Sequence, residues 1–425
     1  MIFSKVAVSI CIPGILLNPA LFAQKKIKTP DELKKVKVYR TLDEAAYNKK
    51  KVYKLNLDGQ NLDEIPEQVF KMKNLQELYL RNNRISKLPP ELTMLTNLQK
   101  LMLGENRIDS IPPFIGSLKN LEDLDLFSNQ IRKMPPETGN LKKLKKLDLN
   151  WNILDSLPET ICSLPELRTL YLERNRLLAL PSDIGRLTLL SEIKLYDNQL
   201  VKLPESFGKL TQLTELNLSK NQLASLPLTF GNLENLILLN LSENNLKTLP
   251  DLSGLTSLKQ LDISNNKLRR ISHELDNLDN INELNLSINQ ISAISLKKDG
   301  LPQLKRLDLE LNEIHDIPPV IFSFSDLIYL NLARNNIERV ENGIRELKNL
   351  QQLFLNDNRI YSVTKYIGDL HMLEYLDLRN NRIRLLQREI GGMTSLKDLH
   401  LENNDISQFQ RNLIKKYLKG PKIYF

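Results

Sequence analysis

The sequence predicts an α/β solenoid, in which a curved parallel β-sheet lines the concave face and turns, 3-10 segments or short helices form the convex face. A chain of 425 residues has the length of about three ordinary domains, but internal repetition overrides that expectation. An asparagine recurs every 23 residues from Asn83 to Asn404, apart from one step of 22 residues. Each of these asparagines ends the pattern L-x-x-L-x-L-x-x-N, with isoleucine replacing leucine at a few positions. With Gln60 in the asparagine slot of the first unit, the pattern predicts sixteen stacked units over residues 52–409.

Residues 1–23 are predicted to be a signal peptide that is removed after Ala23. The stretch 6–22 is apolar, Lys5 precedes it, and a small residue stands at the cleavage position. The alternative is a buried N-terminal helix, but two prolines and a glycine interrupt the run. Cys11 follows too short an apolar stretch for a lipoprotein signal, so lipid attachment is not expected.

Residues 24–51 are predicted to form a basic leader and an N-terminal cap. Positions 24–54 hold eleven Lys or Arg against four Asp or Glu, which accounts for seven of the eight formal positive charges. Because Lys5 supplies the eighth, the long middle of the chain is neutral overall. Segment 41–47 (TLDEAAY) combines an N-capping threonine with early carboxylates, the pattern of a short helix that covers the first leucine row. Residues 24–40 are expected to be a loose leader.

In each unit the L-x-L alternation predicts a short strand whose leucines point into the core while the intervening residues face outward. Stacked units join these strands into one parallel sheet. Strands lie about 4.8 Å apart and the return segments are bulkier, so the sheet lies on the inside of an arc about 75 Å long. The asparagine column is expected to satisfy backbone groups at the strand exit that no ladder reaches, which is a structural role rather than a catalytic one.

The return segments carry a second periodic signal. Ten units place proline six residues after the asparagine position, where a missing N–H and a fixed φ suit a turn leaving the sheet. Proline gives way to other residues in most of the last third, which leaves the geometry there open. A small residue often follows four positions later, and Cys162 occupies this slot in its unit, so we expect it to pack rather than act as a nucleophile.

Residues 410–425 are predicted to form a C-terminal cap. Segment 413–418 has helical spacing, Gly420 and Pro421 stop it, and residues 423–425 (IYF) are expected to add a last strand.

The repeated pattern resembles the leucine-rich repeat. Units with Leu-Pro after the asparagine, such as 221–227 (NQLASLP) followed by 230–233 (FGNL), resemble the short-repeat bacterial class. The opening at 41–45 (TLDEA), the entry strand at 51–57 (KVYKLNL) and the IYF ending make the whole chain similar to exported members of that class in pathogenic spirochaetes. The resemblance covers nearly everything after residue 50 and implies binding of a protein or matrix component at a host or cell surface, without catalysis.

Outward-facing strand positions have no packing role, so their chemistry is the best guide to a binding site. In units eight to eleven they are short and polar, which suits a solvated sheet. Units two to seven instead present large side chains, as interface hot spots do, and a second such group follows near the C-terminus. The candidate ligand-binding residues are Tyr79, Met102, Phe127, Trp151, Tyr171, Arg174, Tyr196, Tyr329, Phe354 and Tyr375. The alternative is that aromatic residues favour strands and merely cover their neighbours.

These features favour an exported, non-enzymatic binding protein, expected to be a monomer, whose concave face recognises a protein or glycan-bearing matrix ligand. An intracellular signalling scaffold is the alternative, and removal or retention of residues 1–23 separates the two. No nucleotide-binding or zinc-protease motif is present, and the array leaves no segment large enough for a catalytic domain, so we expect neither enzyme activity nor a cofactor.

Composition excludes several other classes. Two cysteines and four scattered histidines indicate neither a disulfide framework nor a metal site. The neutral middle weakens a nucleic-acid interpretation, because that function requires a basic stripe along the main surface. No apolar stretch after residue 23 has the length of a membrane span.

Overall fold

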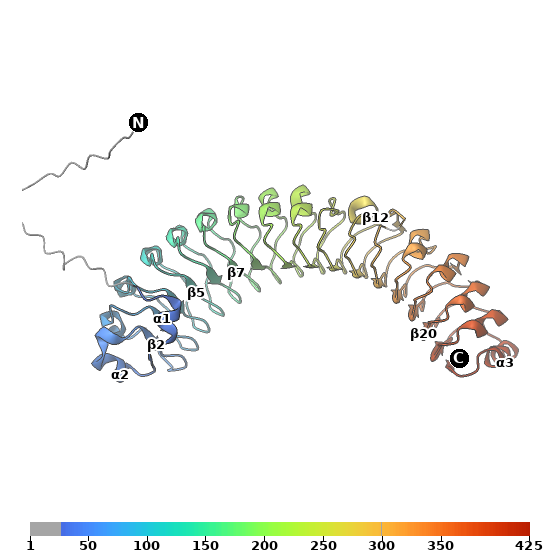
Figure 1. Cartoon of the computed structure of the whole chain (residues 1–425), viewed down its shortest axis with the longest axis horizontal. Helices are drawn as coiled ribbons and strands as arrows, with labels where there is room; N and C mark the ends of the chain where they lie inside the picture. Colours follow the sequence, from blue (N-terminus) through green and yellow to red (C-terminus); the bar gives the residue numbers. More distant parts are fainter. Residues whose placement is uncertain (1–26, 299) are drawn as a thin grey trace, which may run out of the picture.

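The computed structural model describes residues 27–298 and 300–425, which form one arched slab with the sheet along its inner side (Figure 1). The sheet is parallel and has eighteen strands, of which β1 and β22 lie outside the repeats. Neighbouring strands pair at equivalent positions of their units, so Leu78 lies opposite Leu101, and Leu124 opposite Leu147. This confirms the predicted curved solenoid with one strand per unit.

The sixteen repeat strands are β2 (Lys54–Asn56), β3 (Glu77–Tyr79), β4 (Lys100–Met102), β5 (Asp123–Asp125), β6 (Lys146–Asp148), β7 (Thr169–Tyr171), β8 (Glu192–Lys194), β9 (Glu215–Asn217), β10 (Leu238–Asn240), β11 (Gln260–Asp262), β13 (Glu283–Asn285), β15 (Arg306–Asp308), β16 (Tyr329–Asn331), β18 (Gln352–Phe354), β20 (Tyr375–Asp377) and β21 (Asp398–His400).

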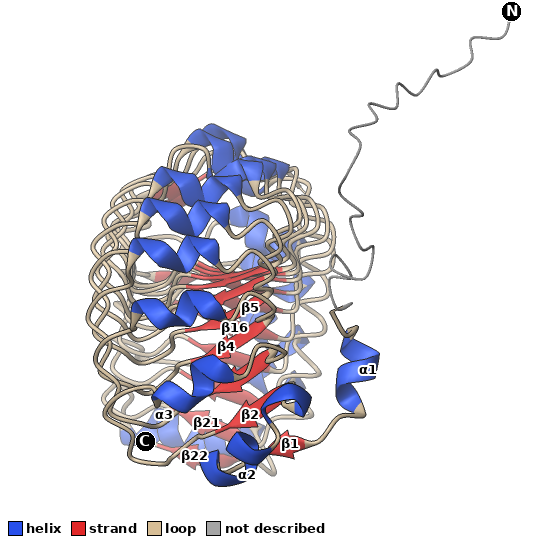
Figure 2. Ribbon diagram, turned by 90° about the vertical axis from the view of Figure 1, so that its left-hand side faces the viewer, coloured by secondary structure: helices blue, strands red, loops and turns tan. Residues whose placement is uncertain are grey.

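The convex side consists of short 3-10 helices, while the α-helices lie in the two caps (Figure 2). Proline at or just before the start of many of these helices fixes the entry turn, as the sequence predicts. The 3-10 helices of the repeats are η3 (Glu67–Lys71), η4 (Pro90–Met94), η5 (Pro113–Ser117), η6 (Pro136–Asn140), η7 (Glu159–Ser163), η8 (Ile184–Arg186), η9 (Glu205–Lys209), η10 (Leu228–Asn232), η11 (His273–Leu275), η12 (Pro319–Ser323), η13 (Asn342–Glu346), η14 (Lys365–Asp369) and η15 (Arg388–Gly392).

The core is a continuous set of aliphatic rows between the sheet and the 3-10 helices. The strand leucines, such as Leu101 and Leu124, have no exposed surface. Each such side chain contributes about 1.5–3 kcal/mol through burial. On the convex side, Phe207 and Phe230 stack with ring centroids 6.2 Å apart. Because every row continues into the next unit, the units form one core and not separate lobes.

The asparagine column joins adjacent units by hydrogen bonds. The Nδ2 of Asn175 donates to the carbonyl oxygens of Leu149 (2.9 Å) and Leu172 (3.1 Å). Its Oδ1 accepts the N–H of Leu154 at 3.0 Å. The same pattern recurs along the array, which confirms the structural role predicted for these residues.

Gln60 differs from the other residues in its column. Its side chain is exposed, whereas the asparagines of most later units are buried. Both Gly59 and Asn61 have positive φ, so the turn of the first unit points Gln60 outward. The expectation that Gln60 fills the amide slot is therefore wrong, although the unit itself is present.

Two of the six units that lack proline form an additional backbone hydrogen bond from that position. The N–H of Ser295 donates to Ile271 O (2.9 Å) and the N–H of Thr364 donates to Val340 O (3.2 Å), both from the proline slot. Proline has no N–H to donate. Two short outer pairs form beside these bonds, β12 (Arg270–Ile271) with β14 (Ala293–Ile294), and β17 (Arg339–Val340) with β19 (Ser362–Val363).

The N-terminal cap is more ordered than predicted. Helix α1 (Pro30–Lys34) begins with a capping box in which Thr29 and Glu32 bond each other's backbone N–H. Strand β1 (Val38–Tyr39) pairs with β2 and buries Tyr39. The expectation of a loose leader is therefore wrong from residue 29 onward, because capping and apolar burial fix it. Helix α2 (Leu42–Tyr47) follows Thr41 as predicted, and η2 (Lys49–Lys51) leads into β2.

The C-terminal cap consists of α3 (Gln408–Tyr417) and β22 (Lys422–Tyr424), and β22 pairs with β21. The helix begins five residues earlier than predicted, because the Ser407 hydroxyl caps the N–H of Gln410. The predicted signal peptide at residues 1–23 lies outside the described residues. No helix in the described ranges has both the length and the apolarity to cross a bilayer.

Candidate ligand-binding surface on the concave face

A left-handed residue precedes every asparagine of the column and lies three residues after the end of each repeat strand. Its φ lies between 51° and 57° in all fifteen of these units. Trp151 occupies this position with φ 56° and is 48% exposed, and Arg174 occupies it in the next unit. A left-handed conformation costs a residue with a Cβ about 1–2 kcal/mol. The backbone thus holds the only tryptophan of the chain at the strand exit, partly exposed, as predicted.

The N-terminal aromatic surface comprises Phe127, Trp151, Tyr171, Arg174 and Tyr196, which follow or end strands β5 to β8. The rings of Phe127 and Trp151 meet edge to face at 6.5 Å. The guanidinium carbon of Arg174 lies 3.9 Å from the centroid of Trp151 and 6.0 Å from that of Tyr196. Phe127, Trp151, Arg174 and Tyr196, which come from four successive units, are therefore joined by contacts into one surface of rings and cation.

Tyr171 lies between two cations. The Nζ atoms of Lys146 and Lys194, on the neighbouring strands, are 4.8 and 4.6 Å from its ring centroid. Burial, with a hydrogen bond to Glu192, raises the pKa of Tyr171 to about 12, so its hydroxyl stays neutral. Beside it, burial raises the pKa of Asp148 to about 6. In the described part of the chain neither lysine forms an ion pair, so both remain available to a ligand.

Tyr79 and Met102 are less suited to binding than expected. The Tyr79 hydroxyl donates to Glu77 at 2.8 Å, and burial raises its pKa. Met102 lies at an outward strand position, as predicted, but it is only 5% exposed, so the expectation that it offers its side chain to a ligand is wrong. Tyr79 and Asp125 flank Met102 at the paired positions of the adjacent strands, β3 and β5.

An ion pair crosses this part of the face. Arg81, in the second unit, reaches Asp125 in the fourth. Gly104 lies between them, and a Cβ there would be 3.1 Å from a carboxylate oxygen of Asp125. The absence of a side chain at Gly104 therefore leaves room for the Asp125 carboxylate that the arginine binds. Asp125 is buried and also accepts the N–H of Phe127, so it is not free for a ligand.

The C-terminal aromatic ladder comprises Tyr329, Phe354, Tyr375, His400 and Tyr424. Successive ring centroids are 5.4, 5.1, 5.3 and 4.4 Å apart. The first four rings alternate between the two ends of their strands, so each contacts the next diagonally, and His400 stacks directly on Tyr424. The last ring comes from the cap strand β22, so the ladder spans the final five strands of the sheet.

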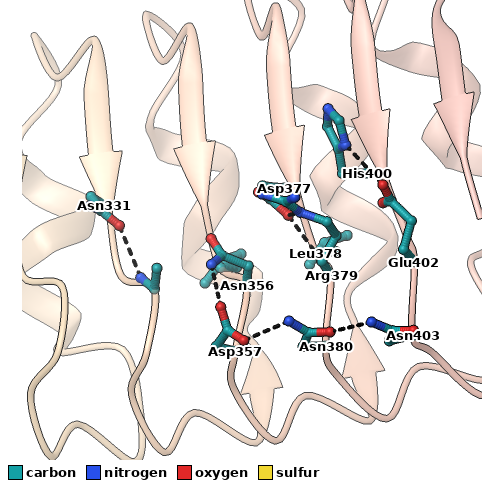
Figure 3. Close-up of polar contacts among 12 residues, drawn as sticks. Asn331, Asn356, Asp357, Asp377, Leu378, Arg379, Asn380, His400, Glu402 and Asn403 are labelled. Atoms are coloured by element: carbon teal, nitrogen blue, oxygen red, sulfur yellow. Dashed lines mark hydrogen bonds and ion pairs between the residues drawn. The ribbon is translucent and has the colours of Figure 1, made fainter.

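Polar contacts fix the lower edge of this ladder (Figure 3). The guanidinium of Arg379 binds both carboxylate oxygens of Asp377, one at 2.6 Å. A row of side chains runs along the strand exits, in which Asn403 donates to Asn380 (2.7 Å) and Asn380 donates to Asp357 (2.6 Å). These bonds pair the polar groups with one another and leave the rings above them to face solvent.

A hollow of about 530 Å³ separates the two aromatic regions. It extends from β9 to β16 over the units whose outward residues are short and polar, including Asn217, Asn240 and Asn285. The amide oxygens of these residues accept the N–H two positions later. The sequence suggests only a solvated sheet here, whereas the curvature makes it the floor of a cavity.

Three features of this face are not predicted from the sequence: the Arg81–Asp125 bridge, the hollow, and the place of Tyr424 in the ladder. The sequence predicts that Tyr424 belongs to a terminal strand. Because successive strand residues point to opposite faces, an inward Ile423 would also place Tyr424 on the outward face. The bridge joins residues two units apart, which no local pattern reveals.

Cys162 is buried in η7, and burial raises the pKa of its thiol to about 11. The thiolate is therefore scarce at neutral pH, in agreement with the predicted packing role. No group of three or more metal-ligating side chains occurs among the described residues.

A parallel sheet on the inside of an arch, with a buried asparagine column at the strand exits, defines a leucine-rich repeat solenoid. Sequence profiles described as leucine rich repeat match residues 119–177, 165–223, 227–268, 302–360 and 372–393, and one described as leucine-rich repeat region matches 51–130. The chain belongs to the leucine-rich repeat family. No curated protein matches the sequence.

Solved structures agree with this assignment. The chain is 32% identical to a leucine-rich repeat protein of Leptospira interrogans over 92% of this chain and all of the other, with a TM-score of 0.65. It is 26% identical to the ectodomain of a membrane receptor kinase from Arabidopsis thaliana, over 91% of this chain and 58% of that one, with a TM-score of 0.53. That ectodomain is in complex with Casparian strip integrity factor 2. An internalin of Listeria monocytogenes (23% identity, 80% and 88% coverage, TM-score 0.57) shares the fold.

Proposed function

We propose that the protein is an exported, non-enzymatic binding protein that recognises a protein ligand or matrix component through its concave face, as a monomer, at a host or cell surface. The observation that carries this proposal is the exposure of Trp151, with Arg174 stacked on it, at a position where the backbone is left-handed. Burial of the ring would stabilise the fold, yet the chain keeps it in contact with solvent. Tryptophan, tyrosine and arginine are the residues enriched in interface hot spots.

The similarity to a receptor ectodomain that is in complex with Casparian strip integrity factor 2 supports the same proposal. The C-terminal aromatic ladder supplies a second apolar surface on the same face. Export rests on the signal-peptide pattern of residues 1–23. Sequencing the N-terminus of the mature protein tests it, because a start at Gln24 supports export and an intact Met1 supports the intracellular scaffold.

The binding proposal is tested by capture of proteins from host extracellular material on immobilised wild-type chain, Trp151→Ala and Leu228→Ala. Leu228 is the matched control, because it is 82% exposed but lies in η10 on the convex side. We expect Trp151→Ala to weaken the captured complex about 30-fold, as a hot spot of about 2 kcal/mol does, with an unchanged melting curve. Equal capture by all three proteins would refute the proposal.

A further inference from the structure

The hollow on the concave face forms where the outward-facing side chains of the strands are short. Rows of short side chains form its floor, and Tyr329 closes it on the C-terminal side. On the other side the N-terminal aromatic surface ends with Tyr196, which follows β8, one strand before the hollow begins. A ligand that touches both aromatic regions therefore passes over the hollow, and any part of it that protrudes can enter.

Four carboxylates elsewhere on this face have internal cationic partners. Glu77 pairs with Lys54 at 3.0 Å, and Asp123 pairs with Lys100 at 3.4 Å. Arg81 and Arg379 neutralise Asp125 and Asp377 in the same way. Four carboxylates of the concave sheet are thus paired, whereas Asp148 and Asp398 form no ion pair in the described chain.

The hollow brings together several carboxylates that have no ion pair among the described residues. Glu215, Asp262 and Glu283 line it, and in the described chain none of them forms an ion pair. Arg306 is the one cation in the lining and lies directly opposite Glu283 in the sheet register. Its guanidinium carbon nevertheless lies 4.1 Å from the ring centroid of Tyr329, on the wall of the hollow. The internal cation is therefore held by an aromatic ring. Asp262 Oδ1 accepts the N–H of Ser264 at 2.9 Å, but Asp262 is partly exposed and Glu215 and Glu283 are exposed, so all three carboxylates can meet an external cation.

We infer that a basic segment of a protein ligand, carrying at least two Lys or Arg side chains, enters this hollow and pairs with Glu215, Asp262 and Glu283. Glu215 and Glu283 lie in one row, three strands apart, which is about 14 Å. That separation is too wide for one small cation and suits charges spaced along a polypeptide. The acidic floor also repels a polyanionic glycan that would otherwise follow the cations near Tyr171.

This inference rests on the proposed use of the concave face, and its test separates the two. The full-length chain is titrated with hexalysine, and with hexaglutamate as the reverse-charge probe, by calorimetry at low salt and in 1 M NaCl. The test variant is Glu215→Gln/Asp262→Asn/Glu283→Gln. The charge-matched control is Glu64→Gln/Glu91→Gln/Glu234→Gln, whose exposed carboxylates lie outside the hollow.

We expect hexalysine to bind and hexaglutamate to bind much more weakly. The test variant should lose at least fivefold in affinity, as expected for three partly exposed pairs, while the control changes less than twofold. The difference should vanish in 1 M salt, where the screening length is about 3 Å. Equal affinities of wild type and test variant, or equal losses in test and control, would overturn the inference, as would complete displacement of hexalysine by equimolar Ca²⁺.

Trp151→Ala should bind hexalysine as the wild type does, because Trp151 does not line the hollow. Failure of the capture experiment with intact hexalysine binding therefore removes the proposed function alone. Normal capture combined with an unaffected test variant removes only the basic segment.

Discussion

Replacing Asn175 by alanine tests how the asparagine column stabilises the array. The carbonyl oxygens of Leu149 and Leu172 each keep another donor in the variant, Asn152 at 3.1 Å and Asn198 at 2.8 Å respectively. The N–H of Leu154 has only Asn175 Oδ1 as its acceptor. The column is therefore redundant at the carbonyl groups and not redundant at the N–H groups.

The magnitude follows from this count. One buried N–H left without an acceptor costs about 1–3 kcal/mol. Asn175 also loses three donor bonds, to Leu149, Leu172 and Glu173 O, each worth at most about 0.5–1.5 kcal/mol because every one of these carbonyl oxygens keeps another donor. We expect Asn175→Ala to lower the free energy of unfolding by about 3 kcal/mol, measured by urea denaturation followed by circular dichroism. Asn235→Ala is the control, because its exposed amide makes a single bond to Thr211 O. A decrease in the free energy of unfolding below 1 kcal/mol, or one equal to that of the control, would refute the proposed role of the Asn175 hydrogen bonds.

Two further predictions concern the fold and its titration. Gly208→Ala places a Cβ 2.2 Å from Thr229 O, so we expect a loss of about 2 kcal/mol by the same urea assay; a fully stable variant would show that η9 and η10 can separate. The pKa of Asp148 is about 6, above its ordinary 3.8, so the native state binds the proton more readily and stability falls as pH rises from 4 to 6. Asp148→Asn keeps the acceptor for Asn150 N–H and should gain about 1 kcal/mol at pH 7.5 and almost nothing at pH 3.5. An equal gain in stability at both pH values would show that the gain does not come from the charge of the buried Asp148 carboxylate.

The fold can be predicted from the sequence because each unit repeats the same pattern of core and turn residues. A leucine that recurs every 23 residues occupies the same row in every unit. Once the strand and core positions of one unit are assigned, those of all other units follow. The partly exposed tryptophan follows in the same way, because Trp151 stands directly before the asparagine of its unit. The helix start at Gln408 depends on a side-chain cap from Ser407, which competes with other local patterns and shifts the boundary by several residues.

The candidate site can be predicted from the sequence only in part, because the exposure of each outward side chain depends on its neighbours in other units. Met102 has the same outward strand position as Tyr79, with which it pairs, yet Met102 is buried and Tyr79 is partly exposed. The Arg81–Asp125 bridge depends on Gly104, one unit away from each partner.

The sequence by itself determined the solenoid, the number of units, the direction in which each strand residue points, and the backbone role of the asparagines, since all of these repeat with a fixed period. Only the tertiary structure decided which outward side chains pair with one another and which remain open. Curvature brings residues of different units within contact distance, and it turns a stretch of short polar residues into a hollow with unpaired carboxylates. Contacts of this kind depend on what stands on the adjacent strands, which a single repeat cannot specify.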